Sequence, residues 1–242
     1  MTERGLTSRR EADELIKNGM VIANNNVVAL GDRVPSDSVI TISEAARKSH
    51  ARKISIIMNK PYSFISQSTE KLPGQRFAKD LLTYDNISPK CTYSGVEPKF
   101  LKKLAVAGRL DSDSSGLLLF SQDGLICKRI ISPGHELEKE YIVRVRELGS
   151  QIDMFDTHTR DSLNRDVIPL LCHGLSFGSR PLKPAKVEWI NDNQLRFVLQ
   201  EGRYRQIRRM CEMVGLEVLR LHRVRIGPIG IGGLQPGKYS MK

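Results

Sequence analysis

The chain has 242 residues and carries 38 Lys and Arg against 27 Asp and Glu, a formal net charge of +11. This excess of positive charge favours a polyanionic partner, nucleic acid before an acidic membrane surface. The sequence has no apolar run long enough to cross a bilayer, and residues 1–5 lack the apolar core of a signal peptide. We therefore expect no membrane role.

The four cysteines and five histidines are scattered through the chain, without the paired spacing typical of zinc ligands. No glycine-rich phosphate loop of the ATP- or dinucleotide-binding type is present. The sequence thus predicts neither a structural metal nor a disulfide framework, it does not imply ATP or NAD, and it favours a reducing compartment.

Residues 1–43 have the pattern of a separate small module. Ser8 and Glu11 form a capping signal ahead of a predicted helix, and Gly19 ends it. Short β-branched segments follow, up to Ile42. Residues 44–53 carry charge without an apolar rhythm, which predicts a linker.

Three basic residues of the first helix, Arg9, Arg10 and Lys17, fall largely off its apolar stripe. They can face the phosphates of a nucleic acid. An ordinary solvated basic helix explains them equally well, and a DNA-binding regulator that uses this helix is a further alternative.

A larger α+β domain is predicted from residue 54 onward. Its expected strands cover residues 54–58, 116–120, 141–146, 195–199 and 218–221, and its strongest helical pattern covers residues 207–214. Residues 68–104 give no clear pattern.

The segment Gly108–Asp111 (GRLD) places a carboxylate just before the polar turn that precedes the apolar run 116–120. A carboxylate held rigidly at the entrance of a buried strand can act as a nucleophile or a base. On these residues alone, the alternative is a turn aspartate that is hydrogen-bonded to its own backbone.

Arginine rather than lysine crowds the segment from residue 203 to residue 225. The planar guanidinium binds phosphate in a bidentate manner and stacks on bases, so this composition favours RNA. A solvated helix face remains the alternative.

Five short segments, taken together and in order, resemble the bacterial-type ribosomal pseudouridine synthases. The branch concerned carries an S-four-type RNA-binding module ahead of the catalytic domain. The resemblance spans nearly the whole chain and rests on residues 8–16 (SRREADELI), 59–61 (NKP), 108–119 (GRLDSDSSGLLL), 138–141 (EKEY) and 206–210 (QIRRM). The module is expected to begin late, because Met1 falls near the end of what would be its first helix.

The resemblance implies roles for the matching positions. Asp111 would be the catalytic aspartate in a cleft that excludes water, Tyr141 would lie against the target uracil, and Arg208 would pair with the aspartate. Arg109 would fill the gap left in the RNA stack when the uridine swings out. Further residues expected to bind RNA are Lys60, Arg9, Arg10, Lys17, Arg203, Arg205 and Arg209. The family needs no metal or organic cofactor.

The expected fold is therefore α+β: a module at 1–43, a linker at 44–53, and a catalytic domain at 54–242 with a mixed, mostly antiparallel sheet flanked by helices. The expected function is isomerisation of uridine to pseudouridine in ribosomal RNA of the large subunit. The alternative is a non-catalytic RNA-binding or ribosome-assembly protein. Ribosomal RNA or a pre-ribosomal particle is the expected partner of a cytoplasmic monomer, organellar if the source is eukaryotic.

Overall fold

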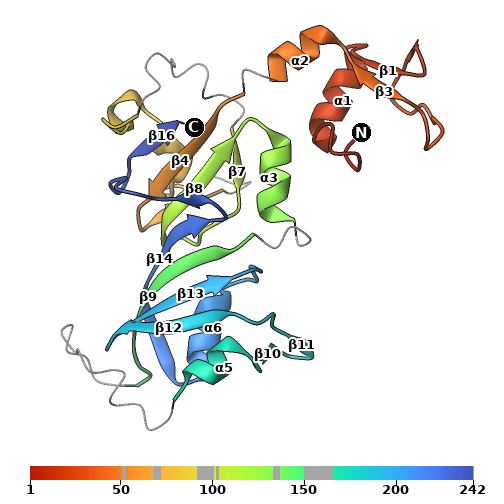
Figure 1. The fold of residues 1–242 in the computed structure, drawn as a ribbon. Coiled ribbons are helices and arrows are strands. Elements are labelled where there is room, and N and C mark those ends of the chain that lie inside the picture. The colour runs from red at the N-terminus through yellow and green to blue at the C-terminus, as the bar shows by residue number, and fades with distance from the viewer. Residues whose placement is uncertain are drawn as a thin grey trace.

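A computed structural model describes residues 1–50, 53–67, 72–91, 101, 104–132, 137–149 and 166–241. Figure 1 shows a small N-terminal part beside a larger body that is built around a long, twisted sheet. The described chain is mixed α+β, with a mostly antiparallel sheet and few helices, which confirms the predicted fold class. Among the described helices, none is both long and apolar enough to span a membrane.

The N-terminal part consists of helix α1 (Arg9–Lys17) and a small antiparallel sheet in the order β2-β1-β3. Ser8 caps α1 by accepting a hydrogen bond from the backbone N–H of Glu11. The strands are β1 (Val21–Ala23), β2 (Asn26–Val27) and β3 (Ile40–Ile42). Asn24 and Asn25 both adopt positive φ in the β1–β2 turn, which asparagine tolerates better than most residues.

The segment predicted as a linker contains helix α2 (Glu44–His50). The N-terminal part also touches the larger body through α3 (Gly124–Ile131). A Cβ added at Gly124 would lie only 2.2 Å from the Cβ of Ser8, and Lys128 Nζ donates to the carbonyl of Thr2 at 3.2 Å. The glycine thus permits a close approach of the two helix N-termini.

Nine of the described strands form the main sheet, whose central path runs β12-β13-β9-β14-β8-β4-β16. Strand β7 adds to β8, and β15 adds to β14. Their bounds are β4 (Ser55–Lys60), β7 (Ala105–Ala107), β8 (Ser115–Ser121), β9 (Lys139–Glu147), β12 (Lys186–Asn191), β13 (Gln194–Leu199), β14 (Leu216–Ile226), β15 (Ile229–Gly230) and β16 (Tyr239–Met241).

Smaller elements surround the sheet. They are the strands β5 (Phe64–Ile65), β6 (Arg76–Phe77), β10 (Ser176–Phe177) and β11 (Arg180–Pro181), the 3-10 helices η1 (Ala78–Leu81) and η2 (Tyr84–Asn86), and the α-helices α5 (Ile168–Cys172) and α6 (Gln206–Met213). In Figure 1, α5 and α6 lie against the lower half of the sheet, and α3 lies beside the upper half.

The contact between β14 and β8 joins the two halves of the sheet, and it is the parallel pair among the described strand pairs of this sheet. Gly116 of β8 lies opposite Arg223 of β14. Gly116 has φ +106°, and a Cβ there would lie 2.2 Å from the carbonyl oxygen of Arg223. Only glycine fits this position, because both its conformation and its surroundings exclude a side chain.

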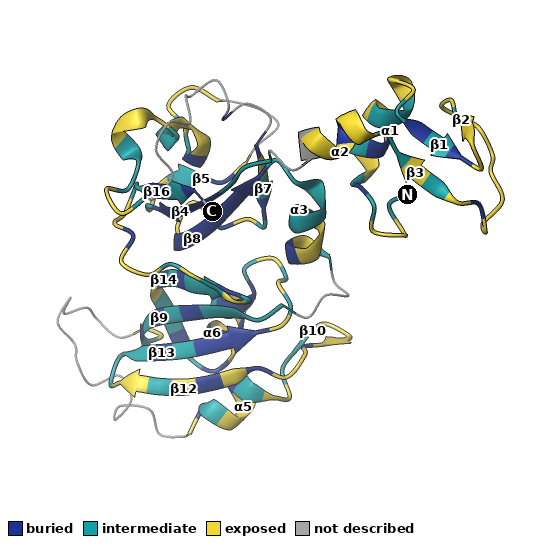
Figure 2. Cartoon of the chain, turned by 45° about the horizontal axis from the view of Figure 1, so that its top comes forward, coloured by how far each residue is buried: buried dark blue, intermediate teal, exposed yellow. Residues whose placement is uncertain are grey.

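The core differs between the two halves of the sheet, as the burial colours of Figure 2 show. Strand β8 is buried along its whole length, because α3 packs on one of its faces and η1 and β16 pack near the other. Its continuous apolar run was predicted to be covered on both faces, and this is confirmed. In β9 the burial alternates, so Tyr141, Val143 and Val145 face α6. We call that side of the sheet the front face and the opposite side the rear face.

Candidate active site

A cleft of about 420 Å³ opens on the front face, where the loop 108–111, strand β9, the loop before α6 and strand β14 meet. Asp111, Tyr141 and Arg208 all line it, so the structure brings together the three side chains that were singled out as catalytic. They come from positions up to 97 residues apart in the chain.

The backbone of the loop that carries Asp111 is held on both sides. Ser66 Oγ donates to the carbonyl of Leu110 at 2.6 Å and also accepts from its N–H at 3.0 Å. Arg223 Nε donates to the carbonyl of Leu117 at 2.8 Å, and its Nη1 reaches the carbonyl of Arg109 at 3.4 Å. Because Ser66 and Arg223 are buried, Asp111 projects from a fixed backbone.

The carboxylate of Asp111 lies at the mouth of the cleft, with 41% of its side chain exposed. Tyr141 is buried, with 9% exposed, in the wall of the same cleft. The water-excluding crevice that was expected around Asp111 is therefore half open in the protein alone. A ligand that covers the mouth of the cleft would have to complete the exclusion of water.

A second carboxylate in the same turn, Asp113, collects the arginines. Its Oδ2 lies 2.9 Å from Arg205 Nη1 and 3.2 Å from Arg208 Nε, and its carbonyl accepts from Arg208 Nη2 at 2.6 Å. The cation nearest to Asp111 is Arg205, at 3.8 Å. The pairing expected between Arg208 and Asp111 is therefore replaced by one between Arg208 and Asp113.

The physical reason lies in the turn and in the start of α6. Arg205 precedes the helix in the left-handed conformation, with φ 49° and ψ 35°, which aims its side chain back across the cleft. Arg208 lies one turn further along and is also held by the carbonyl of Val218 at 3.0 Å. A left-handed non-glycine residue is strained, and such strain is concentrated at functional sites.

The charges at this turn balance one another, whereas the rim of the cleft adds further arginines. Burial raises the pKa of Asp113, but the hydrogen bond from Arg205 and the charge of Arg208 outweigh it, and the net pKa is lowered. Asp113 thus stays ionised and fixes both guanidinium groups. The cluster formed by Arg205, Arg208, Asp111 and Asp113 is balanced by itself, while the remaining rim of the cleft adds Arg109 and Arg203.

Lys60, which was expected to bind RNA, is completely buried. Its Nζ donates to the carbonyls of Pro61 and Phe64, at 3.0 and 2.7 Å. The chain turns back over the end of β4, and its carbonyls bind the ammonium group, which argues against a direct contact of Lys60 with RNA. Burial lowers the pKa of Lys60 to about 8, although the charges of Asp113 and Asp111 oppose that shift.

The other basic residues expected to bind RNA differ in their exposure and in whether they line the cleft. Arg109 is exposed at the rim of the cleft. Arg203 also lines the cleft, but its Nε pairs with Glu201 at 3.1 Å and its Nη1 donates to the carbonyl of Arg180. Arg209 is exposed, with its guanidinium carbon 3.6 Å from the ring centre of Phe177, and it does not line the cleft.

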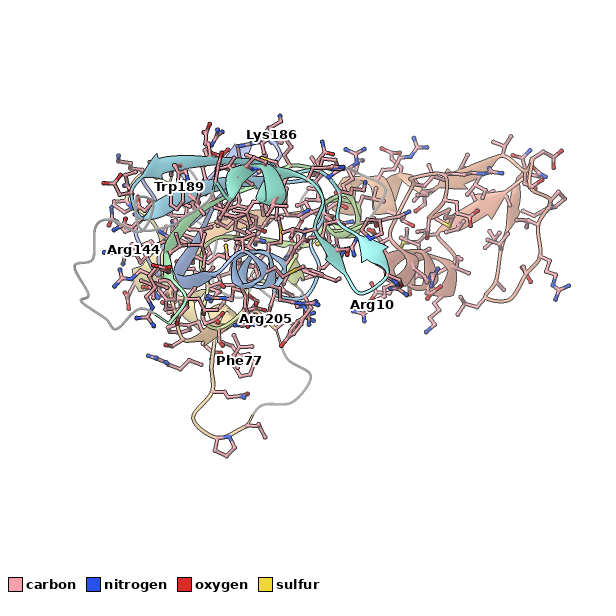
Figure 3. The ribbon with its side chains drawn as sticks, turned by 90° about the horizontal axis from the view of Figure 1, so that it is seen from below. Arg10, Phe77, Arg144, Lys186, Trp189 and Arg205 are labelled. Atoms are coloured by element: carbon pink, nitrogen blue, oxygen red, sulfur yellow. The ribbon has the colours of Figure 1, made fainter. Side chains whose placement is uncertain are left out.

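The basic residues of α1, which are Arg9, Arg10 and Lys17, are exposed and lie outside the cleft. Figure 3 labels Arg205 on the larger body and Arg10 toward the N-terminal part, apart from one another.

Sequence reasoning did not single out four side chains of the cleft and of the loop that carries Asp111. Asp113 was part of a polar turn with nothing to distinguish it from its neighbours. Arg223 was read only as one of many arginines near a strand, and Ser66 gave no signal. Tyr204, a tyrosine at the rim that is 75% exposed, was part of a predicted turn. Within the described residues, no three His, Cys, Asp or Glu side chains are grouped so that they could hold a metal ion.

Comparison with known proteins gives a consistent result. Residues 54–213 match the family model for RNA pseudouridylate synthase. A dual-specificity RNA pseudouridine synthase, RluF of Salmonella typhi, is 31% identical over 99% of this chain and 72% of its own length. Ribosomal large subunit pseudouridine synthase B of Pseudomonas aeruginosa is 30% identical over 97% of this chain and 56% of its own length.

A solved structure of a pseudouridylate synthase is similar to the chain throughout, with a TM-score of 0.58 and 25% identity over 96% of this chain and 89% of that one. The family model covers well over half of the chain and includes the loop 108–111, strand β9 and the loop before α6, all of which line the cleft, while β14 lies beyond it. The resemblance noted in the sequence is confirmed: this chain belongs to the RNA pseudouridylate synthase family of isomerases.

Proposed function

We propose that the chain converts uridine to pseudouridine in ribosomal RNA of the large subunit, with Asp111 as the catalytic carboxylate. The observation that carries this proposal is the cleft, which is lined by Asp111, the buried Tyr141 and several arginines. The relatives' names support the substrate, since one of them acts on the ribosomal large subunit.

The reaction needs no oxidant and no net hydrolysis. The bond between uracil N1 and ribose C1′ breaks, the uracil turns, and a bond between C5 and C1′ forms. C5 loses its proton and N1 ends with one, so substrate and product are isomers. An ionised carboxylate beside C1′ can act as nucleophile or base in this sequence.

The remaining residues of the cleft would bind and enclose the RNA. A uridine must leave its stack to reach Asp111, which costs a few kcal/mol. Tyr141 would lie against the flipped uracil, and Arg109 would fill the gap that it leaves. Tyr204 offers an exposed ring on which a neighbouring base can stack. The RNA would thereby close the half-open mouth of the cleft and exclude water.

Arg205 and Arg208 would position the turn that carries Asp111, acting through Asp113. Arg9, Arg10 and Lys17 would contact RNA phosphates outside the cleft, and Arg209 would do so beyond the rim. The module at 1–43 and the catalytic domain at 54–242, joined through residues 44–53, would thus share one RNA. We propose that the protein acts as a monomer.

The test uses ribosomal RNA from cells that lack the gene, incubated with purified protein, followed by chemical mapping of pseudouridine. The wild type should restore modification at one or a few uridines of the large-subunit RNA. The isosteric variant Asp111→Asn should abolish conversion while it retains the affinity for RNA. Equal conversion by the two proteins would overturn the role of Asp111, and loss of RNA binding in the variant would assign it to binding.

If the gene deletion removes no pseudouridine from ribosomal RNA, and the protein converts none there, the ribosomal substrate is wrong. Tight RNA binding without conversion would favour the non-catalytic alternative, a ribosome-assembly protein.

A further inference from the structure

The two walls of the cleft differ in their chemistry. The wall formed by residues 199–208, from the end of β13 into α6, supplies three arginines. The opposing wall includes the end of α3, which contributes Ile130 and Ile131. Lys128 and Arg129 of the same helix are exposed but do not line the cleft. The helix therefore presents an apolar end to the cleft, although it carries basic residues that could have bound phosphate there.

The two isoleucines of this helix end have different surroundings. Ile130 is 6% exposed and belongs to the core cluster between α3 and the sheet. Ile131 is 57% exposed and belongs to none of the core clusters of the described residues. A single exposed isoleucine is ordinary on a protein surface. Ile131 is unusual because its exposed side chain lines the cleft that holds Asp111.

A second exposed side chain lines the cleft from the other wall. Tyr204 is 75% exposed, and its hydroxyl bonds to no other described residue. Of the described large apolar or aromatic side chains that are exposed, Ile131 and Tyr204 are the two that line the cleft. The cleft thus offers two exposed surfaces that can pack against the face of a base.

The sheet places these two side chains on different sides of the cleft. Tyr204 follows β13, whereas Ile131 ends the helix that packs beside β7. In the strand order, β9 and β14 separate β13 from β8, and β7 pairs with β8. The two halves of the sheet that carry α6 and α3 are distinct in Figure 1. Tyr141 of β9 lines the cleft between them.

Both side chains project from rigid backbone. Gln206 is buried, and its Oε1 accepts from the backbone N–H of Arg203 at 2.9 Å, while its Nε2 donates to Glu201 at 2.9 Å. These bonds close the turn that carries Tyr204. Ile131 is the last residue of α3, and its β-branched side chain has few rotamers. A base that packs against either side chain therefore loses little affinity to the ordering of the protein.

The apolar helix end is next to the reacting centre. A Cβ added at Gly108 would lie 3.6 Å from Cγ2 of Ile130, so the loop that carries Asp111 lies against α3. A uridine that enters the cleft leaves its two neighbouring bases without a stacking partner. Arginines on one wall can hold the phosphates of these nucleotides, and the two exposed side chains can cover the faces of their bases.

We propose that Ile131 packs against the base on one side of the target uridine, while Tyr204 stacks on the base on the other side. The flanking nucleotides are thereby held apart, with Arg109 in the space between them. Because an aliphatic side chain has no hydrogen-bonding group, the Ile131 contact requires a base but does not read its identity. The proposal rests on the proposed function only in that the cleft takes up a uridine from an RNA strand.

The experiment measures the affinity for three RNA hairpins. In the first, the loop carries one uridine between two adenosines, and in the others either the 5′ or the 3′ adenosine is replaced by an abasic nucleotide. For the intact hairpin, Tyr204→Ala should lose about tenfold in affinity, and Ile131→Ala should lose about fivefold. Each loss should vanish on one abasic hairpin and persist on the other, and the two variants should respond to opposite hairpins.

Matched controls are available elsewhere on the surface. Tyr84 is 65% exposed and Ile190 is 48% exposed, and neither lines the cleft, so Tyr84→Ala and Ile190→Ala should bind all three hairpins as the wild type does. Tyr204→Phe, which keeps the ring, should retain its affinity. Ile131→Lys should weaken binding if a base lies there. All these side chains are exposed, so the melting temperatures should stay close to that of the wild type.

Four results would overturn the proposal. They are an equal loss on all three hairpins, a response of both variants to the same abasic position, stronger binding by Ile131→Lys, which would place a phosphate there, and no binding of the intact hairpin. The outcome is separate from catalysis. Conversion of uridine without this dependence on the flanking bases would refute the two contacts alone, whereas the dependence without conversion would leave them standing in a protein that only binds RNA.

Discussion

Arginines and carboxylates pair on both faces of the sheet, but their pairs join different parts of the structure. On the rear face, Glu140 lies between Arg196 and Arg225, and each charge is held by a partner on a neighbouring strand. On the front face, Asp113 receives two arginines from a loop and a helix start, at a mouth that is open to solvent. Carboxylates at the rear thus join neighbouring strands, whereas the carboxylate at the front holds two arginine side chains in place.

The largest effect is expected at the contact between β8 and β14, which joins the two halves of the sheet. Gly116→Ala should lower the free energy of unfolding by about 4 kcal/mol, because its Cβ would overlap the backbone of Arg223. Denaturant unfolding followed by circular dichroism would measure this loss. The control is Gly174→Ala, whose φ of +107° matches but whose Cβ meets nothing within 4 Å. It should cost only about 1–2 kcal/mol. Equal losses would show that strain alone, and not the strand contact, requires glycine.

The front-face carboxylate should affect activity more than stability. Asp113→Asn keeps the shape but releases Arg205 and Arg208, so the turn that carries Asp111 loses its fixed position. We expect kcat to fall by about 10- to 100-fold. The free energy of unfolding should change by less than about 1 kcal/mol. Single-turnover conversion and denaturant unfolding measure the two quantities. Asp192→Asn, the same chemical change in a distant turn, serves as control, and an equal fall there would refute the positioning role.

The rear-face carboxylate Glu140 should affect stability more than activity. Glu140→Gln weakens two ion pairs between strands and should cost about 1 kcal/mol of stability, while conversion per folded molecule stays as in the wild type. A loss of activity without a loss of stability would break the comparison between the faces.

The difference in the free energy of unfolding between wild type and Glu140→Gln should become smaller as the pH falls. Hydrogen bonds from Arg196 and Arg225 lower the pKa of Glu140 below its ordinary value of 4.5. The stabilisation is therefore complete above pH 4.5 and is lost as the pH falls through the lowered value. The gap in stability between wild type and Glu140→Gln should close on acidification.

A further pH effect concerns Lys60, which is buried at the end of β4. Its pKa of about 8, below the ordinary 10.5, means that the unfolded chain binds more protons between those two values. Wild type should then gain stability relative to Lys60→Met as the pH rises from 7 to 10. Urea unfolding of both proteins at several pH values measures this. A difference that is constant with pH would mean that Lys60 is solvated.

Much of the fold could be predicted from local pattern. The strand at β8, the alternation in β9, the strand at β13 and the helix α6 were all expected from the spacing of apolar residues, and each is found within a few residues of its predicted bounds. Helix α3 and strand β12 were not predicted. Strand β14 was predicted as four residues but has eleven, because Arg223 and Arg225, which obscure the apolar pattern, bind partners on β8 and β9.

By itself, the sequence determined the order of the motifs, the buried central strand and the excess of basic charge, because these depend on residue type and spacing alone. Only the tertiary structure decided which carboxylate each arginine meets and which lysine is buried. Asp113 and Arg208 are 95 residues apart, and their contact depends on the junction of β8 with β14 and on where α6 begins. No local pattern contains that information, because it arises from the register between strands that are distant in the chain.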